Sequence, residues 1–403
     1  MLNLFSKKSI SEQNITVYYL MQFCHSLIFS IPIWIVFYRR VITIEEISFL
    51  VGFQYFIQII AELPTGAFAD ILGKRVSIII GFLFFAASSL LFPFAQGFTH
   101  YLVLAAFMGL ADSFLSGSVD ALLYDSLKQD GRETEFAAVL AKQSIFYQLG
   151  LVTSTALGGL IYKWHIFAPF FIEGSFFLLG GFFASLLREP KVDSEIFTIR
   201  NYLRQIKHGA KEAFKNSFLK KLSWFYIMVG AITWSAALYF NSSLMVDLGF
   251  SDEVRGFLLG LMRLFNIVFL TNLLKNKKLF TERNSIIFFP VLMIIALLPG
   301  IYLQSWWALP FVAGSMAAST ARWIVLGRMT NDHFSSKYRS TAISTLSMVI
   351  GIFYTMFTII SGPVIKLGTT RLMYTILGLV TVVVVVPLAK SLLLDIDKNS
   401  KAN

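Results

Sequence analysis

The sequence predicts an all-α membrane protein, in which twelve transmembrane helices form two pseudo-symmetric six-helix bundles. Composition is the first reason: of 403 residues, 56% are hydrophobic and only 14% are charged, and the mean hydropathy is +0.69. Soluble domains are about one quarter charged. The second reason is a succession of twelve apolar runs, and the third is a long polar segment that divides these runs six and six.

Each run is long enough to cross about 30 Å of hydrocarbon as a helix, which satisfies its own backbone hydrogen bonds. The first run is too long for a cleavable signal peptide and lacks a small-residue cleavage site, so we expect none. The single cysteine, Cys24, excludes an internal disulfide and a cysteine-cluster metal site. The twelve runs cover 15–38, 44–68, 76–95, 101–123, 137–161, 167–187, 221–247, 254–274, 285–303, 307–327, 341–366 and 372–393.

The net charge of +11 is distributed as a membrane topology requires. If the N-terminus is inside, the inner segments hold 26 of the 34 Lys and Arg residues and the outer segments hold six. This asymmetry predicts that both termini are cytoplasmic. We expect the positive segments to meet the bilayer and its anionic lipids at the cytoplasmic face, and we expect no nucleic-acid partner.

The polar segment 188–220 separates a predicted N-terminal bundle, 1–187, from a C-terminal bundle, 221–403. Apolar and basic residues recur within it at helical spacing on two different faces. The pattern predicts a basic amphipathic helix at the inner membrane surface, with a solvated linker helix as the alternative. The apolar residues are Ile199, Leu203, Ile206, Ala210 and Phe214, and the basic ones are Arg200, Arg204, Lys207, Lys211 and Lys215.

The two halves resemble each other at an offset near 200. "TIEEISFLVG" ends at Gly52 and "SDEVRGFLLG" ends at Gly260, and each begins with a candidate helix N-cap, Thr43 or Ser251. Thr43 with Glu46 fits a capping box. Asp120 falls opposite Arg322, and Gly150 falls opposite Gly351. Internal repeats of several helices are typical of secondary transporters.

The segment "GAFADILGKR" lies between the second and third runs. It resembles the loop signature of the major facilitator superfamily (MFS), G-x-x-x-D-x-x-G-(R/K)-(R/K), and the resemblance extends over all twelve spans. It implies the MFS fold, transport by alternating access, and a loop that latches the two halves together when the cavity opens outward; a polar turn is the alternative. This latch motif comprises Gly66, Asp70, Gly73, Lys74 and Arg75.

Residue types in the latch motif suit that role. Gly66 allows a close helix approach, and Gly73 allows a tight turn. Asp70 would face the N-terminus of the eleventh span, near Ser340 or Thr341, whose N–H groups favour a carboxylate. Lys74 and Arg75 hold the loop inside.

The chain is similar to the bacterial drug:proton antiporter branch of this family, with two departures. Where that branch often has an Arg in the fourth span, this sequence has Asp112. In the fifth span Gly150, Gly158 and Gly159 keep the spacing of the branch signature and predict close helix packing, but the central Gly-Pro is missing.

Ionisable residues inside spans are functional candidates. Asp112 is the first choice for a proton or cation carrier, with Arg263 as a possible partner, because a carboxylate in an apolar cavity can bind a proton in one state and release it in another. Asp120 and Arg322 are predicted to pair across the two halves as part of a cytoplasmic gate, unless each is satisfied within its own half. Further candidates are Glu62, Asp125 and Glu173.

By resemblance, the first, fourth, seventh and tenth spans line the central cavity. His25 is a possible titrating group there, although a hydrogen-bonded wall residue is the alternative. Aromatic residues in these spans serve either packing or an amphiphilic cargo. The candidate wall residues are Gln22, His25, Ser26, Ser116, Trp234, Asn241, Ser315 and Ser319.

These features predict a secondary active transporter that moves a small organic solute across the bacterial cytoplasmic (inner) membrane, by proton-coupled export of the multidrug type. Uptake or facilitated permeation of a polar metabolite, or a sensor on a transporter fold, are the alternatives. The sequence contains no G-x-x-x-x-G-K-[ST] phosphate loop, no H-E-x-x-H and no G-x-S-x-G, which disfavours an ATP-driven pump and an enzyme. We expect a monomer with no metal and no cofactor, driven by the proton gradient.

Overall fold

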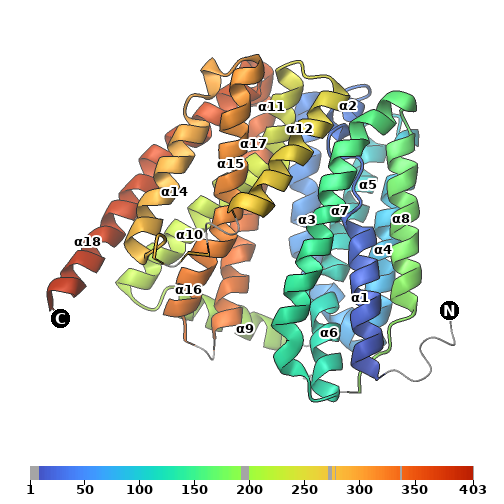
Figure 1. Cartoon of the computed structure of the whole chain (residues 1–403), viewed down its shortest axis with the longest axis horizontal. Coiled ribbons are helices and arrows are strands. Elements are labelled where there is room, and N and C mark those ends of the chain that lie inside the picture. The colour runs from blue at the N-terminus through green and yellow to red at the C-terminus, as the bar shows by residue number, and fades with distance from the viewer. Residues whose placement is uncertain (1–8, 192–198, 271–274, 277, 336–337, 403) are drawn as a thin grey trace. The chain divides into compact units, whose positions relative to one another are not determined.

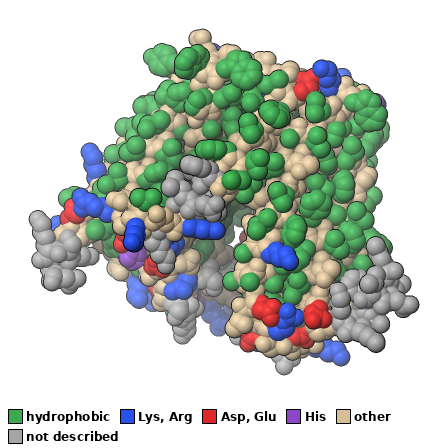
Figure 2. Space-filling model, viewed as in Figure 1, with side chains coloured by type: hydrophobic (Ala, Val, Ile, Leu, Met, Phe, Trp, Pro, Cys, Tyr) green, Lys and Arg blue, Asp and Glu red, His purple; other side chains and the backbone are tan. Residues whose placement is uncertain are grey.

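The computed structural model describes residues 9–191, 199–270, 275–276, 278–335 and 338–402, and within these ranges the regular structure is entirely helical (Figure 1). Hydrophobic side chains cover the visible lengths of the helices, whereas charged side chains gather near helix ends (Figure 2). Many large apolar side chains are exposed, for example Leu83, Ile295 and Val383. Such surfaces are stable where lipid covers them.

The chain divides into two compact units, each described separately below. Unit 1 comprises Met1–Phe37, Phe53–Ile199 and Asp252–Gly260, and unit 2 comprises Tyr38–Gly52, Arg200–Ser251 and Leu261–Asn403. Each unit therefore includes one short segment from the other half of the sequence. The division into bundles 1–187 and 221–403 stays a prediction.

Unit 1 is built around α4, which packs against α5 and α8, and α1, which packs against α7 and α8. Its core is aromatic, with Phe82, Phe85 and Phe177 all buried. The elements of this part of the chain are α1 (Ile10–Ser26), α2 (Trp34–Tyr38), α3 (Ile44–Leu72), α4 (Lys74–Leu91), η2 (Phe92–Phe94), α5 (Phe98–Leu115), α6 (Ser118–Gln129), η3 (Glu133–Glu135), α7 (Phe136–Trp164) and α8 (Ala168–Ser185).

Unit 2 packs α10 against α17 and α18, and α14 against α15. Four of its segments are π-helical, a geometry that often marks functional sites. Its elements are α9 (Ile199–Ala213), α10 (Ser217–Ser235), η4 (Ala236–Phe240), α11 (Asn241–Asp247), α12 (Asp252–Phe265, shared with unit 1), η5 (Asn266–Leu270), α14 (Glu282–Leu297), η6 (Gly300–Tyr302), η7 (Ser305–Ala308), α15 (Leu309–Ala321), η8 (Arg322–Leu326), α16 (Gly327–His333), α17 (Arg339–Val380), η9 (Thr381–Val385) and α18 (Val386–Ala402).

Within the described residues, nine helices are long and apolar enough to cross a membrane, so the number twelve stays a prediction. Three predicted spans account for the difference. The run 15–38 is divided between α1 and α2, the run 254–274 extends beyond the described residues at 271–274, and the runs 341–366 and 372–393 lie in one continuous helical stretch.

The first apolar run is not one helix because its backbone changes direction after Ser26. Pro32 supplies no N–H donor, and the residue before a proline disfavours helical geometry. The N–H of Ser30 donates to the carboxylate of Glu173 instead of to a helical carbonyl, over 2.9 Å. Between the eleventh and twelfth runs, non-helical angles at Gly368 and Thr369 mark a kink inside α17.

The two repeated decapeptides begin α3 and α12. In unit 2, Glu45 forms an ion pair with Lys366 at 2.5 Å, and the start of α3 lies close to α17 at Gly362. In unit 1, Glu253 forms an ion pair with Lys163 at 2.5 Å, and the start of α12 lies close to α7 at Gly159. The repeat in the sequence thus corresponds to a repeated helix junction.

The predicted capping box forms at the start of α3. Thr43 and Glu46 form both bonds of the capping box, with the N–H of Thr43 donating to Glu46 over 2.8 Å and the N–H of Glu46 donating to Thr43 over 3.3 Å. Ser251 occupies the N-cap position of α12, as its spacing predicts, although its side chain makes no capping hydrogen bond.

Helix α9 lies within the predicted basic segment. Within unit 2, the ring of His208 on this helix lies 5.4 Å from the ring of Tyr338, and the N–H of Ser335 donates to Glu212 over 3.0 Å. This hydrogen bond lowers the pKa of the Glu212 carboxyl below its usual range. The basic residues of α9 are exposed, while Leu203 on the predicted apolar face is also 57% exposed.

A methyl group at Gly159 tests the junction between α7 and α12. In Gly159→Ala, the new Cβ overlaps the backbone carbonyl of Asp252, which cannot rotate away. We expect the free energy of unfolding to fall by about 1–3 kcal/mol, and the midpoint of thermal unfolding in detergent to fall with it. Gly97→Ala is the control, because a Cβ there meets nothing within 4 Å. Equal midpoints for the two variants would show that the junction is not closely packed.

The Glu212 contact predicts a pH dependence. Because its pKa is lower in the folded chain, the stability it contributes is fully present above its ordinary value of 4.5 and disappears as the pH falls through the folded value. Glu212→Gln is expected to lower the free energy of unfolding by about 0.5–1 kcal/mol at pH 7 and by progressively less as the pH falls below 4.5. Thermal unfolding at a series of falling pH values measures this, with the exposed Glu133 changed to Gln as control. A difference from wild type that does not shrink as the pH falls would contradict it.

Candidate functional site

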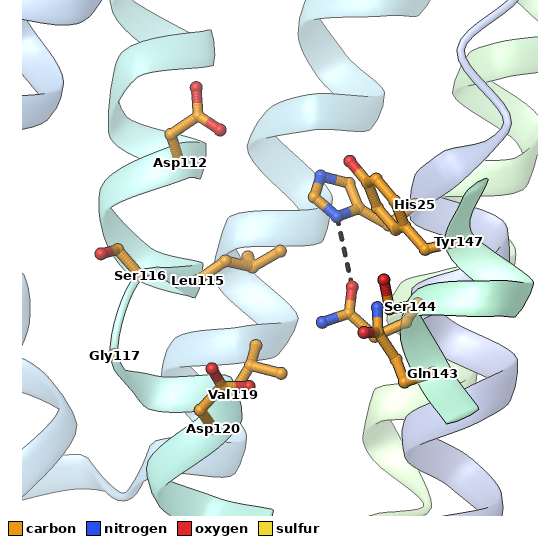
Figure 3. Close-up of a pocket in the computed structure, with 11 residues that line it drawn as sticks. His25, Asp112, Leu115, Ser116, Gly117, Val119, Asp120, Gln143, Ser144 and Tyr147 are labelled. Carbon is orange, nitrogen blue, oxygen red and sulfur yellow. Dashed lines mark hydrogen bonds between the residues drawn. The ribbon is translucent and has the colours of Figure 1, made fainter. Parts of the chain in front are cut away.

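A polar pocket of about 410 Å³ lies within unit 1 (Figure 3). Four helices contribute to its walls: α1, α5, α6 and α7. Five residues named from the sequence line it, together with six that the sequence did not single out. The lining residues are Gln22, His25, Asp112, Leu115, Ser116, Gly117, Val119, Asp120, Gln143, Ser144 and Tyr147.

The fourth predicted span breaks inside this pocket. α5 ends at Leu115 and α6 begins at Ser118, and Gly117 between them has φ +75°, which a side chain would strain. Asp112, Ser116 and Asp120 therefore do not share one face of a continuous helix, as their spacing predicts. The pocket nevertheless collects all three, because Asp112 precedes the break and Asp120 follows it.

Asp112 lies in the last turn of α5 and is half-buried. The side-chain amide of Gln54, on α3, donates to one of its oxygens over 3.4 Å. Glu62, a further predicted candidate, is half-buried on the same helix α3 and contacts the side chain of Ser116 at the break. Two residues of α3 thus contact the pocket: Gln54 contacts Asp112, and Glu62 contacts Ser116 between α5 and α6.

Asp120 lies in the first turn of α6 and is exposed to the pocket. The hydroxyl of Tyr18, on α1, donates to it over 3.1 Å. Asp120 lies at a helix N-terminus, where the first N–H groups of α6 carry partial positive charge.

His25 forms the opposite wall with Tyr147 (Figure 3). Its Nδ1 lies 3.4 Å from Oε1 of Gln22, and its ring centroid lies 5.1 Å from that of Phe85 and 5.9 Å from that of Phe82. This packing makes it a positioned wall residue whose ring faces the pocket.

The α7 wall was missed by sequence reasoning. Tyr147 follows Ser144 by three residues and Gln143 by four, so both lie next to it on one side of the helix, which is a signal the sequence does contain. Gln54 and Tyr18 were missed because a single polar residue in an apolar span gives no information on its partner in another helix.

The latch motif turns at Gly73, which has φ +98° and precedes α4. The carboxylate of Glu189 accepts the N–H groups of Lys74 and Arg75 over 2.8 and 2.9 Å. The ammonium of Lys74 forms an ion pair with Asp125 on α6. The motif is thereby attached to the helix that also carries Asp120, while Asp70 is exposed.

Glu173 is 1% exposed, and its position is that of a structural group. Its two oxygens accept the N–H of Ser30 over 2.9 Å and the hydroxyl of Ser89 over 2.8 Å. It therefore fixes the chain after α1 to α4 and α8.

Ser26 does not line the pocket but lies between α1 and α7, where its hydroxyl donates to the carbonyl of Phe23 over 2.6 Å. A Cβ at Gly150 would overlap this Ser26 hydroxyl, and a Cβ at Gly158 would overlap the carbonyl of Phe29. Together with Gly159, these glycines give the close helix approach that their spacing predicts.

Arg322 is fully buried in unit 2, at the first position of the π-helical segment η8. Its guanidinium carbon lies 4.2 Å from the ring centroid of Trp323 and 5.4 Å from those of Tyr226 and Trp234. These aromatic faces attract the cation.

Unit 2 also contains a cluster of buried polar side chains around Asn241. The Ser315 hydroxyl donates to Oδ1 of Asn241 over 2.8 Å, and the Tyr374 hydroxyl donates to the same oxygen. Asn241 is 1% exposed and Ser315 is 2% exposed. Ser319 and Arg263 are both half-buried.

Three predicted contacts would join the two units and stay predictions: Asp120 with Arg322, Asp112 with Arg263, and Asp70 with the start of α17.

The family model that matches this chain is that of the Major Facilitator Superfamily, over residues 16–319. The chain belongs to this superfamily. Since these are membrane transporters, the protein is a transmembrane transporter and not an enzyme.

Curated relatives include two from Bacillus subtilis (strain 168). The uncharacterized MFS-type transporter YxaM is 26% identical over 62% of this chain and 63% of its own length. Multidrug resistance protein 1 is 27% identical over 43% of this chain and 41% of its own length. The chain thus matches less than two thirds of the length of either relative.

Solved structures share the fold. The nucleoside transporter NupG aligns with a TM-score of 0.73 and 12% identity, covering 96% of this chain and 98% of that chain. A bacterial homolog of the human lysosomal transporter Spinster aligns with a TM-score of 0.70 and 14% identity, covering 96% of both chains.

Glu173→Gln separates a structural role from proton carriage. The amide of Gln has one oxygen, so it cannot accept hydrogen bonds from both Ser30 and Ser89 at two separate oxygens. We therefore expect the free energy of unfolding to fall by about 1–3 kcal/mol. Solute-driven proton movement per folded molecule should be retained in proteoliposomes. Unchanged stability with abolished proton movement would instead make Glu173 a carrier.

Proposed function

We propose that this MFS transporter is a proton-coupled exporter of small organic solutes, and that the pocket in unit 1 binds both solute and proton. The single observation that carries the proposal is Asp112, a carboxylate in the middle of an apolar span that faces a polar pocket of about 410 Å³. Such residues in membrane spans are costly and mark ion or substrate pathways.

The surroundings of Asp112 suit reversible protonation. Gln54 is the hydrogen-bond donor that the structure gives it, and no Lys or Arg is among the described residues that line the pocket. A carboxylate with so little compensation binds a proton when the pocket is empty and releases it when a solute is bound. Alternating access then carries one occupant in each direction.

Export is favoured by the sequence similarity to a multidrug resistance protein, although that match covers less than half of either chain. Uptake or facilitated permeation of a polar metabolite is the second candidate, and it is favoured by the amide and hydroxyl groups of Gln22, Gln143 and Ser144 in the pocket wall. A sensor on the same fold would bind solute without moving it.

The proposal extends to the setting of the protein. We place it in a bacterial cytoplasmic membrane with both termini inside, because the Lys and Arg residues favour that topology. The exposed basic residues of α9 would meet anionic lipids there. A monomer driven by the proton gradient, with no cofactor, is the form that we propose.

Proton movement in proteoliposomes tests the function. With purified protein and an internal pH dye, tetraphenylphosphonium, ethidium or uridine is added across an imposed pH gradient. We expect at least one of them to drive proton flux in the wild type, and Asp112→Asn to reduce this flux at least tenfold, because the variant cannot carry the proton.

The matched control is Asp395→Asn. Asp395 lies on α18 of unit 2, where its carboxylate forms an ion pair with Lys221 on α10. This variant should retain the flux. Solute flux that is independent of the pH gradient would contradict proton coupling, and binding without any flux would favour the sensor. Inside-out and right-side-out vesicles distinguish export from uptake.

A further inference from the structure

The pocket of unit 1 holds two carboxyl groups, and no basic side chain among its described walls is placed to balance their charge when they ionise. Two of its lining side chains are carboxylates, Asp112 and Asp120, and among the described residues that line it none is a Lys or Arg. The remaining polar walls are amides, hydroxyls, one phenol and one imidazole, all of which are neutral or only weakly basic groups.

Two basic residues that contact elements around the pocket have partners elsewhere. Lys74 forms an ion pair with Asp125, on α6. Lys142, directly before the wall residue Gln143, is exposed and places its ammonium 5.4 Å from the ring centroid of Tyr19. Neither side chain lines the pocket.

The two carboxylates lie on either side of the break at Ser116–Gly117, so both face one space instead of following one another along a helix. Each receives one side-chain donor, from Gln54 or from Tyr18. A carboxylate offers about four acceptor positions, which leaves most of them for a ligand.

The size of the space argues for an organic ligand. A volume of about 410 Å³ lies in the range of small-molecule sites, whereas a bare metal ion needs a tight cluster of ligands. Within the described residues, no group of three or more His, Cys, Asp or Glu side chains could hold a metal ion. The rings of His25 and Tyr147 on the opposite wall provide faces for alkyl groups on a cation.

We propose that the pocket selects organic ammonium cations, with the positive charge bound between Asp112 and Asp120. This inference rests on the proposed function and names its substrate class. The amides of Gln22 and Gln143 then contact polar substituents of the same molecule.

The test compares a cation with its uncharged isostere. Choline and 3,3-dimethylbutan-1-ol have the same shape and differ in the charge of one atom, and tetraethylammonium and benzyltrimethylammonium extend the series in size. Binding to the purified full chain in detergent is measured by calorimetry and by the shift in unfolding midpoint. We expect at least one cation to bind, the neutral isostere not to bind, and Asp112→Asn and Asp120→Asn each to weaken cation binding at least tenfold.

Asp395→Asn should bind cations like the wild type, and the unfolding midpoints of all variants without ligand show whether each is folded. The inference is overturned if no cation of the series binds, if the neutral alcohol binds as tightly as choline, or if both pocket variants keep full affinity. Because binding is measured without a membrane, failure of this inference is distinguishable from failure of the proposed function, which fails when a bound solute drives no proton flux.

Discussion

The cost of holding a carboxylate inside a membrane span governs the structure of unit 1. A charge in hydrocarbon costs several kcal/mol unless polar groups or water surround it. The chain meets this demand at Glu173 with two internal donors, and at Asp112 and Asp120 with one side-chain donor each and an open polar pocket. The first arrangement fixes helices together, whereas the second leaves room for a ligand and a proton.

The break in the fourth span connects this pocket to the latch motif. α6 carries Asp120 at its first turn and, five residues later, Asp125, which is ion-paired with Lys74 of the motif. The short helix α6 therefore carries both the pocket residue Asp120 and the residue that pairs with Lys74, and Gly117 separates it from α5.

Hydropathy, charge asymmetry and the motif "GAFADILGKR" were sufficient to predict the helical membrane fold and the superfamily, because these signals are local or compositional. The capping box at Thr43 was predicted for the same reason. The break at Ser116–Gly117 was not, since the apolar pattern continues across it and only the Ser-Gly pair signals a turn. The partners Gln54 and Tyr18 depend on contacts between helices that periodicity does not encode. The α7 wall around Tyr147 does show helical spacing in the sequence, but that spacing does not tell which cavity the face lines. The roles of Asp70 and Arg322 involve both units and remain predictions.

Proton release on ligand binding tests the central claim most directly, namely that solute and proton share the pocket around Asp112. Purified protein in weakly buffered detergent at pH 7 is mixed with a cation that binds, and the change in bulk pH is recorded. The account predicts release of up to about one proton per bound cation, and its absence in Asp112→Asn although that variant still binds at higher concentration. Binding to the wild type without any proton release, at any pH between 6 and 8, would contradict it.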